Sequence, residues 1–260
     1  EVRNGGRGTG DGRKEKQPNK IMDVTRIEYV QDWDWMQHLM LDMTRKQERI
    51  RQADGAKHPW NPRWDEDREK KLAIDRLKER FFVPKLNPMK KAQLVLAFHG
   101  CDHETAERIC ESGFEDVQTR DAGFFGKGFY FTSYAEYAAK YATGMINSRP
   151  TKPNVNGEHV ILACWVSPGM AYPCTRPTDY SKGNNHSHFC AVEGQMPHTF
   201  PKGASSMYAL INEDRGFQVV NIERKTGHEM LPVHWDELVT NERSRILPAF
   251  KIYFKKKSRH

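Results

Sequence analysis

The sequence predicts an α+β protein, because its first third and its remainder carry different hydrophobic periodicities. Between residues 23 and 82, apolar side chains recur at three- and four-residue steps, the period of an amphipathic helix. After residue 88, short apolar runs bounded by glycine, proline and polar residues are typical of strands. A length of 260 residues allows one large domain, or a moderate domain with an appended segment.

Composition excludes several classes of protein. The mean hydropathy of −0.81 and the lack of a long uncharged apolar run exclude a membrane-spanning helix. The chain has no signal-peptide pattern and opens on Glu1 rather than Met, so we expect an excised fragment. Its five cysteines form no CxxC pair. This predicts reduced thiols and an intracellular location, in cytoplasm or nucleus.

The net charge of +7 is concentrated at the two ends of the chain. Residues 1–20 and 251–260 together hold eleven basic and three acidic side chains, whereas the rest holds 30 basic and 31 acidic. We therefore expect a disordered basic tail over 1–20, rich in glycine and charge, and a second basic tail over 255–260. Such tails favour weak, salt-dependent contact with nucleic acid. Solubilising termini are the simpler interpretation.

A helical N-terminal subdomain is predicted for residues 21–90. Its first helix spans 23–55, with an apolar face repeated every three or four residues. Its second helix opens at Asn61-Pro62, a capping residue followed by proline at the first helical position, and ends before Pro84. The apolar residues of the first helix are Ile27, Val30, Trp33, Met36, Leu39, Met40, Met43 and Ile50.

Strands dominate the region after Pro88, with two short helices between them. Apolar runs predict strands over 93–98, 160–166, 217–222, 237–240 and 246–254. Helices are predicted for 103–112, ending at Gly113, and for 134–141, capped by Ser133. The stretch 173–215 is rich in proline, glycine, histidine and serine, which predicts a long functional loop.

The most specific block of sequence spans residues 98–142. A strand ends in His99-Gly100, where glycine permits close approach of a ligand to the backbone. The tight turn Gly126-Lys127-Gly128 leads into a strand with Tyr130, and the next helix carries Tyr141. Two tyrosines, a histidine and open backbone suit a flat heteroaromatic ring attached to sugars. Taken singly, Tyr130 and His99 are equally compatible with core packing.

This block resembles the poly(ADP-ribose) polymerase-type catalytic domain of the ADP-ribosyltransferases, the diphtheria-toxin-like group with a His-Tyr-Glu triad. The resemblance is carried by HG, by FGKGFYF and by the helix with a further tyrosine. A second half, WDELVTNERSRILPAF, places Glu237 eleven residues before Pro248, as in the family's last strand pair. The resemblance covers 93–254. It implies a catalytic domain over 91–254, with two small antiparallel sheets around an NAD cleft and flanking helices.

The resemblance also implies the roles of site residues. His99, Tyr130 and Glu237 would form the catalytic triad, with His99 on the adenosine ribose and Glu237 on the 2′-hydroxyl of the nicotinamide ribose. The Gly100 backbone would hold the carboxamide, and Tyr130 and Tyr141 would enclose the nicotinamide ring. The remaining positions expected to bind NAD are Cys101, Gly126, Lys127, Gly128 and Ala138. Two of these positions depart from the family pattern. Cys101 stands where the family usually has Ser or Thr, and Ala138 stands where it often has Ser.

Glu237 is the residue on which the expected chemistry depends. Cleavage of the bond to nicotinamide leaves an oxocarbenium-like sugar, whose developing positive charge a fixed carboxylate stabilises. The same carboxylate can help to deprotonate an incoming hydroxyl. Outside its motif, a glutamate here would read as a solvated edge-strand residue. Three nearby glutamates compete for the role if the alignment shifts: Glu223, Glu229 and Glu242.

The function expected from the resemblance is NAD-dependent ADP-ribosyl transfer to a macromolecule, with release of nicotinamide. NAD is the co-substrate, protein is the foremost acceptor, and the basic tails favour nucleic acid as a second acceptor class. The 173–215 stretch would shape acceptor choice. NAD hydrolysis, a non-catalytic module that binds NAD or ADP-ribose, and a basic-tailed nucleic-acid binder remain alternatives. No metal is expected, because His186, His188 and Cys190 lack a fourth ligand and paired spacing.

Overall fold

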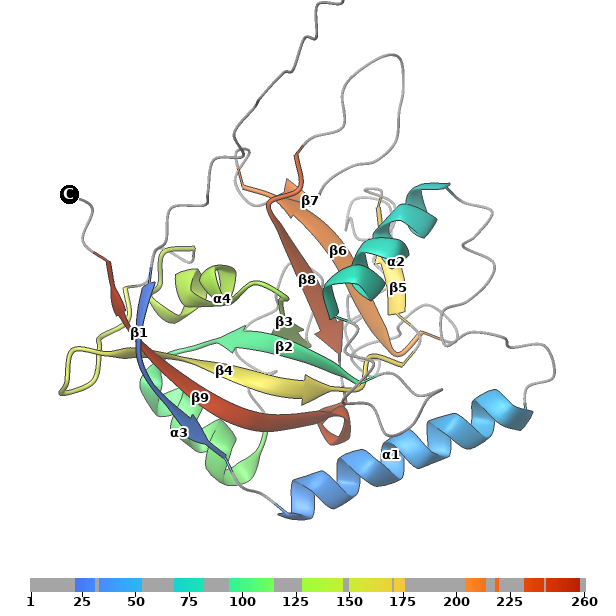
Figure 1. Cartoon of the computed structure of the whole chain (residues 1–260), viewed down its shortest axis with the longest axis horizontal. Coiled ribbons are helices and arrows are strands. Elements are labelled where there is room, and N and C mark those ends of the chain that lie inside the picture. Colours follow the sequence, from blue (N-terminus) through green and yellow to red (C-terminus); the bar gives the residue numbers. More distant parts are fainter. Residues whose placement is uncertain are drawn as a thin grey trace, which may run out of the picture.

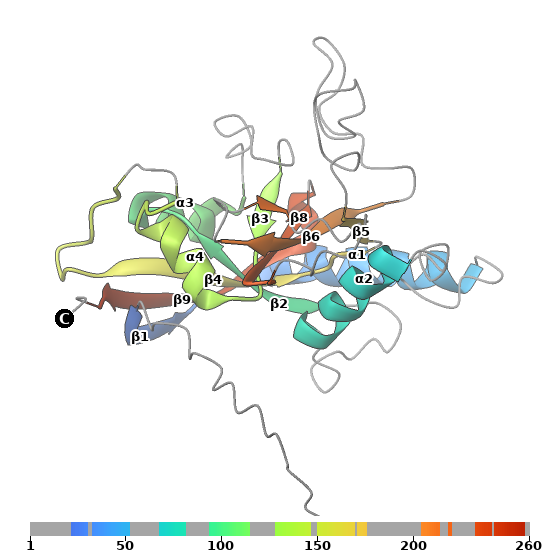
Figure 2. The same cartoon turned by 90° about the horizontal axis from the view of Figure 1, so that it is seen from above.

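Two β-sheets and four α-helices make up the described part of the chain (Figure 1). Helices α1 and α2 lie toward one end of the molecule, and α3 and α4 toward the other (Figures 1 and 2). Within the described residues, no helix combines the length and apolar character needed to cross a membrane. The computed structural model describes residues 22–30, 33–52, 68–81, 94–114, 128–146, 150–169, 171–175, 204–213, 218–219, 232–240 and 242–257.

The first sheet is antiparallel throughout, with the strand order β1-β9-β4-β2. Strand β9, from the C-terminal part of the chain, therefore lies between the first strand and β4. Its pairing with β1 joins Met22 to Lys256 and Tyr29 to Phe250. The strands are β1 (Met22–Tyr29), β2 (Val95–Gly100), β4 (His159–Val166) and β9 (Ile246–Lys256).

The prediction of a helix from residue 23 is wrong at its start, because residues 22–29 form strand β1. Ile27, assigned to the buried face of that helix, lies in β1 instead and is 60% exposed. Pairing with distant β9 fixes the extended conformation, and the helix α1 begins only at Trp33 (Trp33–Gln52). The three- and four-residue spacing of apolar side chains continues across the boundary between β1 and α1, so it gives no sign of where the helix begins.

The second sheet is mixed rather than antiparallel. Its order is β3-β8-β6-β5, with β7 also pairing with β6, and the β5–β6 pair is parallel. This corrects the expectation of two antiparallel sheets. It also corrects the predicted loop over 173–215, which contains all of β6 and the last two residues of β5. The strands are β3 (Phe129–Phe131), β5 (Ala171–Cys174), β6 (Ser206–Asn212), β7 (Gln218–Val219) and β8 (Trp235–Thr240).

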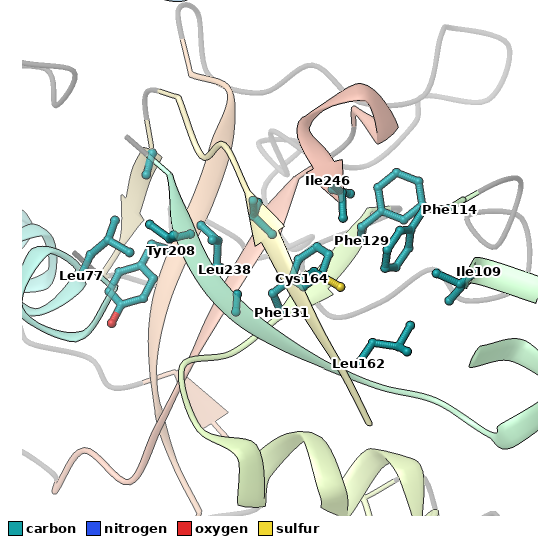
Figure 3. Close-up of a cluster of buried hydrophobic side chains, with 14 of the residues drawn as sticks. Leu77, Ile109, Phe114, Phe129, Phe131, Leu162, Cys164, Tyr208, Leu238 and Ile246 are labelled. Carbon is teal, nitrogen blue, oxygen red and sulfur yellow. The ribbon is translucent and has the colours of Figure 1, made fainter. Parts of the chain in front are cut away.

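The largest core lies between the two sheets. The first sheet contributes Val95 and Leu162 to it, and the second sheet contributes Phe131 and Leu238. Helix α2 (Arg68–Phe81) contributes Leu77. Figure 3 shows part of this core as one continuous cluster, with Leu77 at one end and Ile109 at the other. Helix α2 is therefore part of the same core as the sheets.

The two predicted helices near the sequence motif are both present. Helix α3 (His103–Ser112) matches its prediction, with the Asp102 side chain accepting from the Thr105 amide at 2.8 Å and Gly113 at φ 79°. Helix α4 (Ala135–Ala142) is capped at Tyr134 without a side-chain hydrogen bond, so the prediction of a Ser133 cap is wrong. The Ser133 hydroxyl donates instead to Asp236. A 3-10 turn, η5 (Arg243–Arg245), joins β8 to β9.

Candidate active site

Strand β8 and helix α4 bring the predicted glutamate against two tyrosines. Glu237 lies in a strand buried on both faces and is 6% exposed. Its Oε1 accepts hydrogen bonds from the Tyr137 hydroxyl at 2.7 Å and the Tyr141 hydroxyl at 3.0 Å. The two tyrosines reach the same oxygen because residues four apart lie on one face of a helix. Glu237 is therefore a buried, doubly hydrogen-bonded carboxylate.

The surroundings of Glu237 change its acidity in opposing directions. Burial raises the pKa of the Glu237 carboxyl, the hydrogen bonds from Tyr137 and Tyr141 lower it, and the neighbouring Asp236 raises it again. The net result is a pKa above the ordinary value. Burial also raises the pKa of Tyr137, as does the adjacent Glu237 charge, so its phenol stays protonated and can donate.

Tyr130 shares a sheet face with Glu237. It pairs with Val239 across the β3–β8 ladder, and Val239 lies two residues from Glu237 on the same strand. Alternate residues of a strand point to the same face, so Tyr130, Glu237 and Val239 do so together. On the other side of β8, Ala209 of β6 pairs with Glu237, placing only a methyl group beside the carboxylate. Tyr130 and Tyr141 both lie against the hydrophobic cluster that contains Val239.

His99 ties the first sheet to the second at the end of β2. Its Nδ1 lies 2.8 Å from the Tyr130 carbonyl oxygen, which can only accept, so Nδ1 carries the proton. The ring meets Phe114 and Phe131 at centroid distances of 5.2 and 5.7 Å. Burial lowers the pKa of His99, which keeps the ring neutral near pH 7. In that state Nε2 is a hydrogen-bond acceptor.

Glycine is required by close contact at two predicted positions. A Cβ on Gly100 would lie 1.9 Å from the Ala138 carbonyl oxygen and 2.9 Å from the Tyr141 Cβ. The end of β2 therefore touches the backbone of α4 next to the tyrosine. A Cβ on Gly128 would lie 2.7 Å from Val239 Cγ1 and 3.2 Å from the Thr240 carbonyl oxygen, so this glycine lets the chain entering β3 approach β8.

Two other predicted positions contribute packing. Cys101 is partly buried, and burial raises the pKa of its thiol, which remains protonated. The Ala138 side chain is 1% exposed and lies in a separate apolar cluster with Ile161 and Phe98. The structure therefore places its methyl group in the apolar contact between α4 and the first sheet, apart from the hydrophobic cluster that contains Tyr137 and Val239.

The remaining candidates are the other predicted NAD-binding positions and the three glutamates that compete with Glu237. Gly126 and Lys127 lie outside the described residues, as do Glu223 and Glu229. Glu242 lies at the start of η5, where it pairs with Arg245. Of the described glutamates at these candidate positions, Glu237 is the one that contacts the α4 tyrosines.

Sequence reasoning missed two residues that organise this region. Tyr137 donates the shorter hydrogen bond to Glu237, and its spacing of four from Tyr141 was the signal available. Asp236, 1% exposed, accepts from the Thr132 hydroxyl at 2.9 Å, and from the Ser133 amide and hydroxyl at 2.7 and 2.6 Å. Tyr208 also donates to it, at 3.1 Å. These bonds fasten the β3–α4 turn to β8.

The described residues contain no group of three or more His, Cys, Asp or Glu side chains able to hold a metal ion. His186, His188 and Cys190 lie outside the described residues.

Comparison with known proteins identifies a family. Residues 13–197, more than half of the chain, match the family model described as the poly(ADP-ribose) polymerase catalytic domain. No curated protein matches the chain. The matched range includes His99, Tyr130 and Tyr141, begins upstream of the sequence resemblance at residue 93, and ends before Glu237. Glu237 is therefore connected to the matched region by its contacts with α4.

Proposed function

The chain belongs to the poly(ADP-ribose) polymerase catalytic domain family, whose members use NAD as a substrate, and we propose that it transfers ADP-ribose from NAD to a macromolecule. Nicotinamide is released, and an intracellular protein is the foremost acceptor. The observation that carries the proposal is the contact of Glu237 with the α4 tyrosines, which joins the predicted catalytic carboxylate to the family-matched helix.

Glu237 supports this chemistry because of its burial and fixed orientation. As the bond between nicotinamide and ribose breaks, positive charge develops on the sugar. A carboxylate already held in place stabilises that charge without reorganising. Its ionised form can also take the proton of the acceptor hydroxyl. Within the described residues, Oε2 accepts no hydrogen bond, so it is the oxygen that would meet a ribose hydroxyl.

The other triad members support binding of NAD. A neutral His99 with its proton on Nδ1 offers Nε2 as an acceptor for a ribose hydroxyl. Tyr130 and Tyr141 supply aromatic rings for the nicotinamide. The Gly100 backbone, which follows His99 and contacts α4, would hold the carboxamide. These are the groups expected for a substrate with two riboses and a flat charged ring.

The test is to incubate the protein with NAD labelled on the adenylate, in the presence of cell extract or of RNA. Nicotinamide release with label on protein is the expected result. Label on RNA alone would replace the proposed acceptor. Free ADP-ribose without an adduct would indicate a hydrolase, and no nicotinamide release would contradict both enzymatic functions and favour a binding module.

Two variants assign the carboxylate. Glu237→Gln should lower turnover by about 100-fold or more while NAD binding survives, because the amide keeps the shape but loses the charge. The matched control is Glu242→Gln, which alters an exposed glutamate just before η5 and should leave turnover unchanged. Equal activity of Glu237→Gln and the native protein would mean that another carboxylate acts.

A further inference from the structure

Tyr137 is the most completely enclosed of the tyrosines around Glu237. It is 1% exposed, and its ring stacks on Trp235 with centroids 5.5 Å apart and an interplanar angle of 6°. Its other side meets Tyr141 edge-on, at 5.4 Å. Trp235 lies two residues before Glu237 on β8, so one strand supplies both the ring support and the hydrogen-bond acceptor of Tyr137.

A second set of contacts fastens this part of α4 to the second sheet. Lys140, on the turn between the two tyrosines, pairs with Glu213 after the end of β6. The other oxygen of Glu213 accepts from Trp235 Nε1 at 2.8 Å. Lys140 also lies over the Trp235 ring, 4.8 Å from its centroid. Tyr137 therefore has little freedom to move relative to Glu237.

We propose that Tyr137 is a positioning residue, which engages Oε1 of Glu237 and thereby turns Oε2 toward the substrate. This deepens the proposed function and rests on it. Tyr137 is only 1% exposed, so we expect it to act through the carboxylate rather than by touching NAD.

The geometry of the shared oxygen supports this assignment. A carboxylate oxygen has two lone-pair directions, and the two phenols use both of them on Oε1. Substrate hydroxyls can then be accepted only by Oε2. Tyr141 is partly exposed and would also contact the nicotinamide ring, whereas Tyr137 is buried. The bond from Tyr137 is also the shorter of the two, at 2.7 against 3.0 Å.

The experiment compares Tyr137→Phe with the native protein, since this change deletes only the hydroxyl. Turnover should fall about 10- to 100-fold, because a hydrogen bond to a charged group is lost, while KM for NAD stays within about twofold. The acidic limb of the pH–rate profile should move to higher pH. The titratable groups that contact Glu237 are Tyr137 and Tyr141 of α4, and the charge of Asp236, next to it on β8, also acts on it. Removing one stabilising donor makes the carboxylate harder to ionise.

A second readout does not require turnover. The Glu237 carboxyl can be titrated by NMR in protein labelled with 13C-carboxyl glutamate, with Glu237→Gln identifying the signal. Its pKa should be higher in Tyr137→Phe than in the native protein. If the native protein proves inactive but this increase is seen, the proposed function fails while the Tyr137–Glu237 contact stands. An unchanged Glu237 titration overturns the inference.

The matched control is Tyr208→Phe, which removes a phenol–carboxylate bond of the same kind from the adjacent Asp236. It should lower thermal stability to a similar extent without moving the acidic limb or the Glu237 titration. If Tyr208→Phe shifts the limb as far as Tyr137→Phe does, the effect is merely structural and the assignment to Tyr137 is wrong.

Discussion

Asp236 and Glu237 are consecutive buried carboxylates of β8 that point to opposite faces of the sheet. Asp236 accepts from the β3–α4 turn and from Tyr208, whereas Glu237 accepts from the two tyrosines of α4. Because successive side chains of a strand point to opposite faces, these two neighbouring residues contact different parts of the protein. One carboxylate holds the turn that begins α4, and the other faces the tyrosines that α4 carries.

This separation predicts different consequences of neutralising each carboxylate. Asp236→Asn should lower the free energy of unfolding by about 1–3 kcal/mol, since it replaces an acceptor surrounded by donors. Glu237→Gln should change stability much less and abolish most turnover. Urea denaturation of both variants, alongside an NAD turnover assay, checks this. An Asp236→Asn variant as stable as the native protein would mean that the turn does not depend on this carboxylate.

Gly100→Ala should disrupt the junction of β2 and α4. The new methyl carbon would overlap the Ala138 carbonyl oxygen, and backbone atoms cannot move aside as a flexible side chain can. We expect a loss of about 1–3 kcal/mol in unfolding free energy together with weaker NAD binding, both measurable by thermal shift. Gly157→Ala is the comparison: its added methyl meets no atom within 4 Å, although its φ of 74° remains unfavourable. Equal thermal shifts for the two variants would contradict the contact.

Leu77→Ala should test the place of α2 in the core. Leu77 is fully buried in the cluster between the sheets, so its truncation should lower unfolding free energy by about 2–5 kcal/mol. Leu72, five residues earlier on the same helix, is 43% exposed, and Leu72→Ala should change stability by less than about 0.5 kcal/mol. If both variants unfold at the same urea concentration, α2 does not form part of the core in solution.

Glu158 should make the attachment of β1 depend on pH. It accepts from the Thr25 hydroxyl at 2.6 Å, from Asn154 and from Arg26, and these contacts lower the pKa of its carboxyl to about 2. Because the folded-state pKa lies below the unfolded value, its stabilisation is complete above the ordinary pKa and disappears as pH falls toward 2.

The difference in unfolding free energy between the native protein and Glu158→Gln should therefore be constant from pH 7 to about 5 and shrink below about 4.5. Denaturation series at several pH values measure this difference. A difference that persists unchanged at the lowest pH would assign the effect to shape rather than charge.

The sequence predicted those elements whose signals are local. Helix α3 was predicted to the residue, because Asp102 and Gly113 mark its two ends by their own chemistry. Strand β1 was missed because its conformation comes from pairing with β9, far along the chain. Strand β6 was missed because the apolar run from Met207 to Ile211 lies at the end of a long polar stretch, whose composition dominated the interpretation.

The candidate site divides in the same way. Gly100 and Tyr141 could be singled out from their motif, and the structure brings the Gly100 backbone close to the Tyr141 Cβ. The contacts of Tyr137 and Asp236 could not be predicted, because each depends on how α4 is oriented across β8. The packing of the Ala138 side chain among Ile161 and Phe98 could not be predicted either, and its expected contact with NAD stays a prediction.

The place of β9 between β1 and β4 has a consequence for how the protein is made. Strand β1 is synthesised before β9 and has no partner in its sheet until β9 has been made, so its backbone stays unpaired until then. Folding must then close contacts between distant parts of the chain, which is intrinsically slow. Completion of this sheet therefore has to wait for the synthesis of β9.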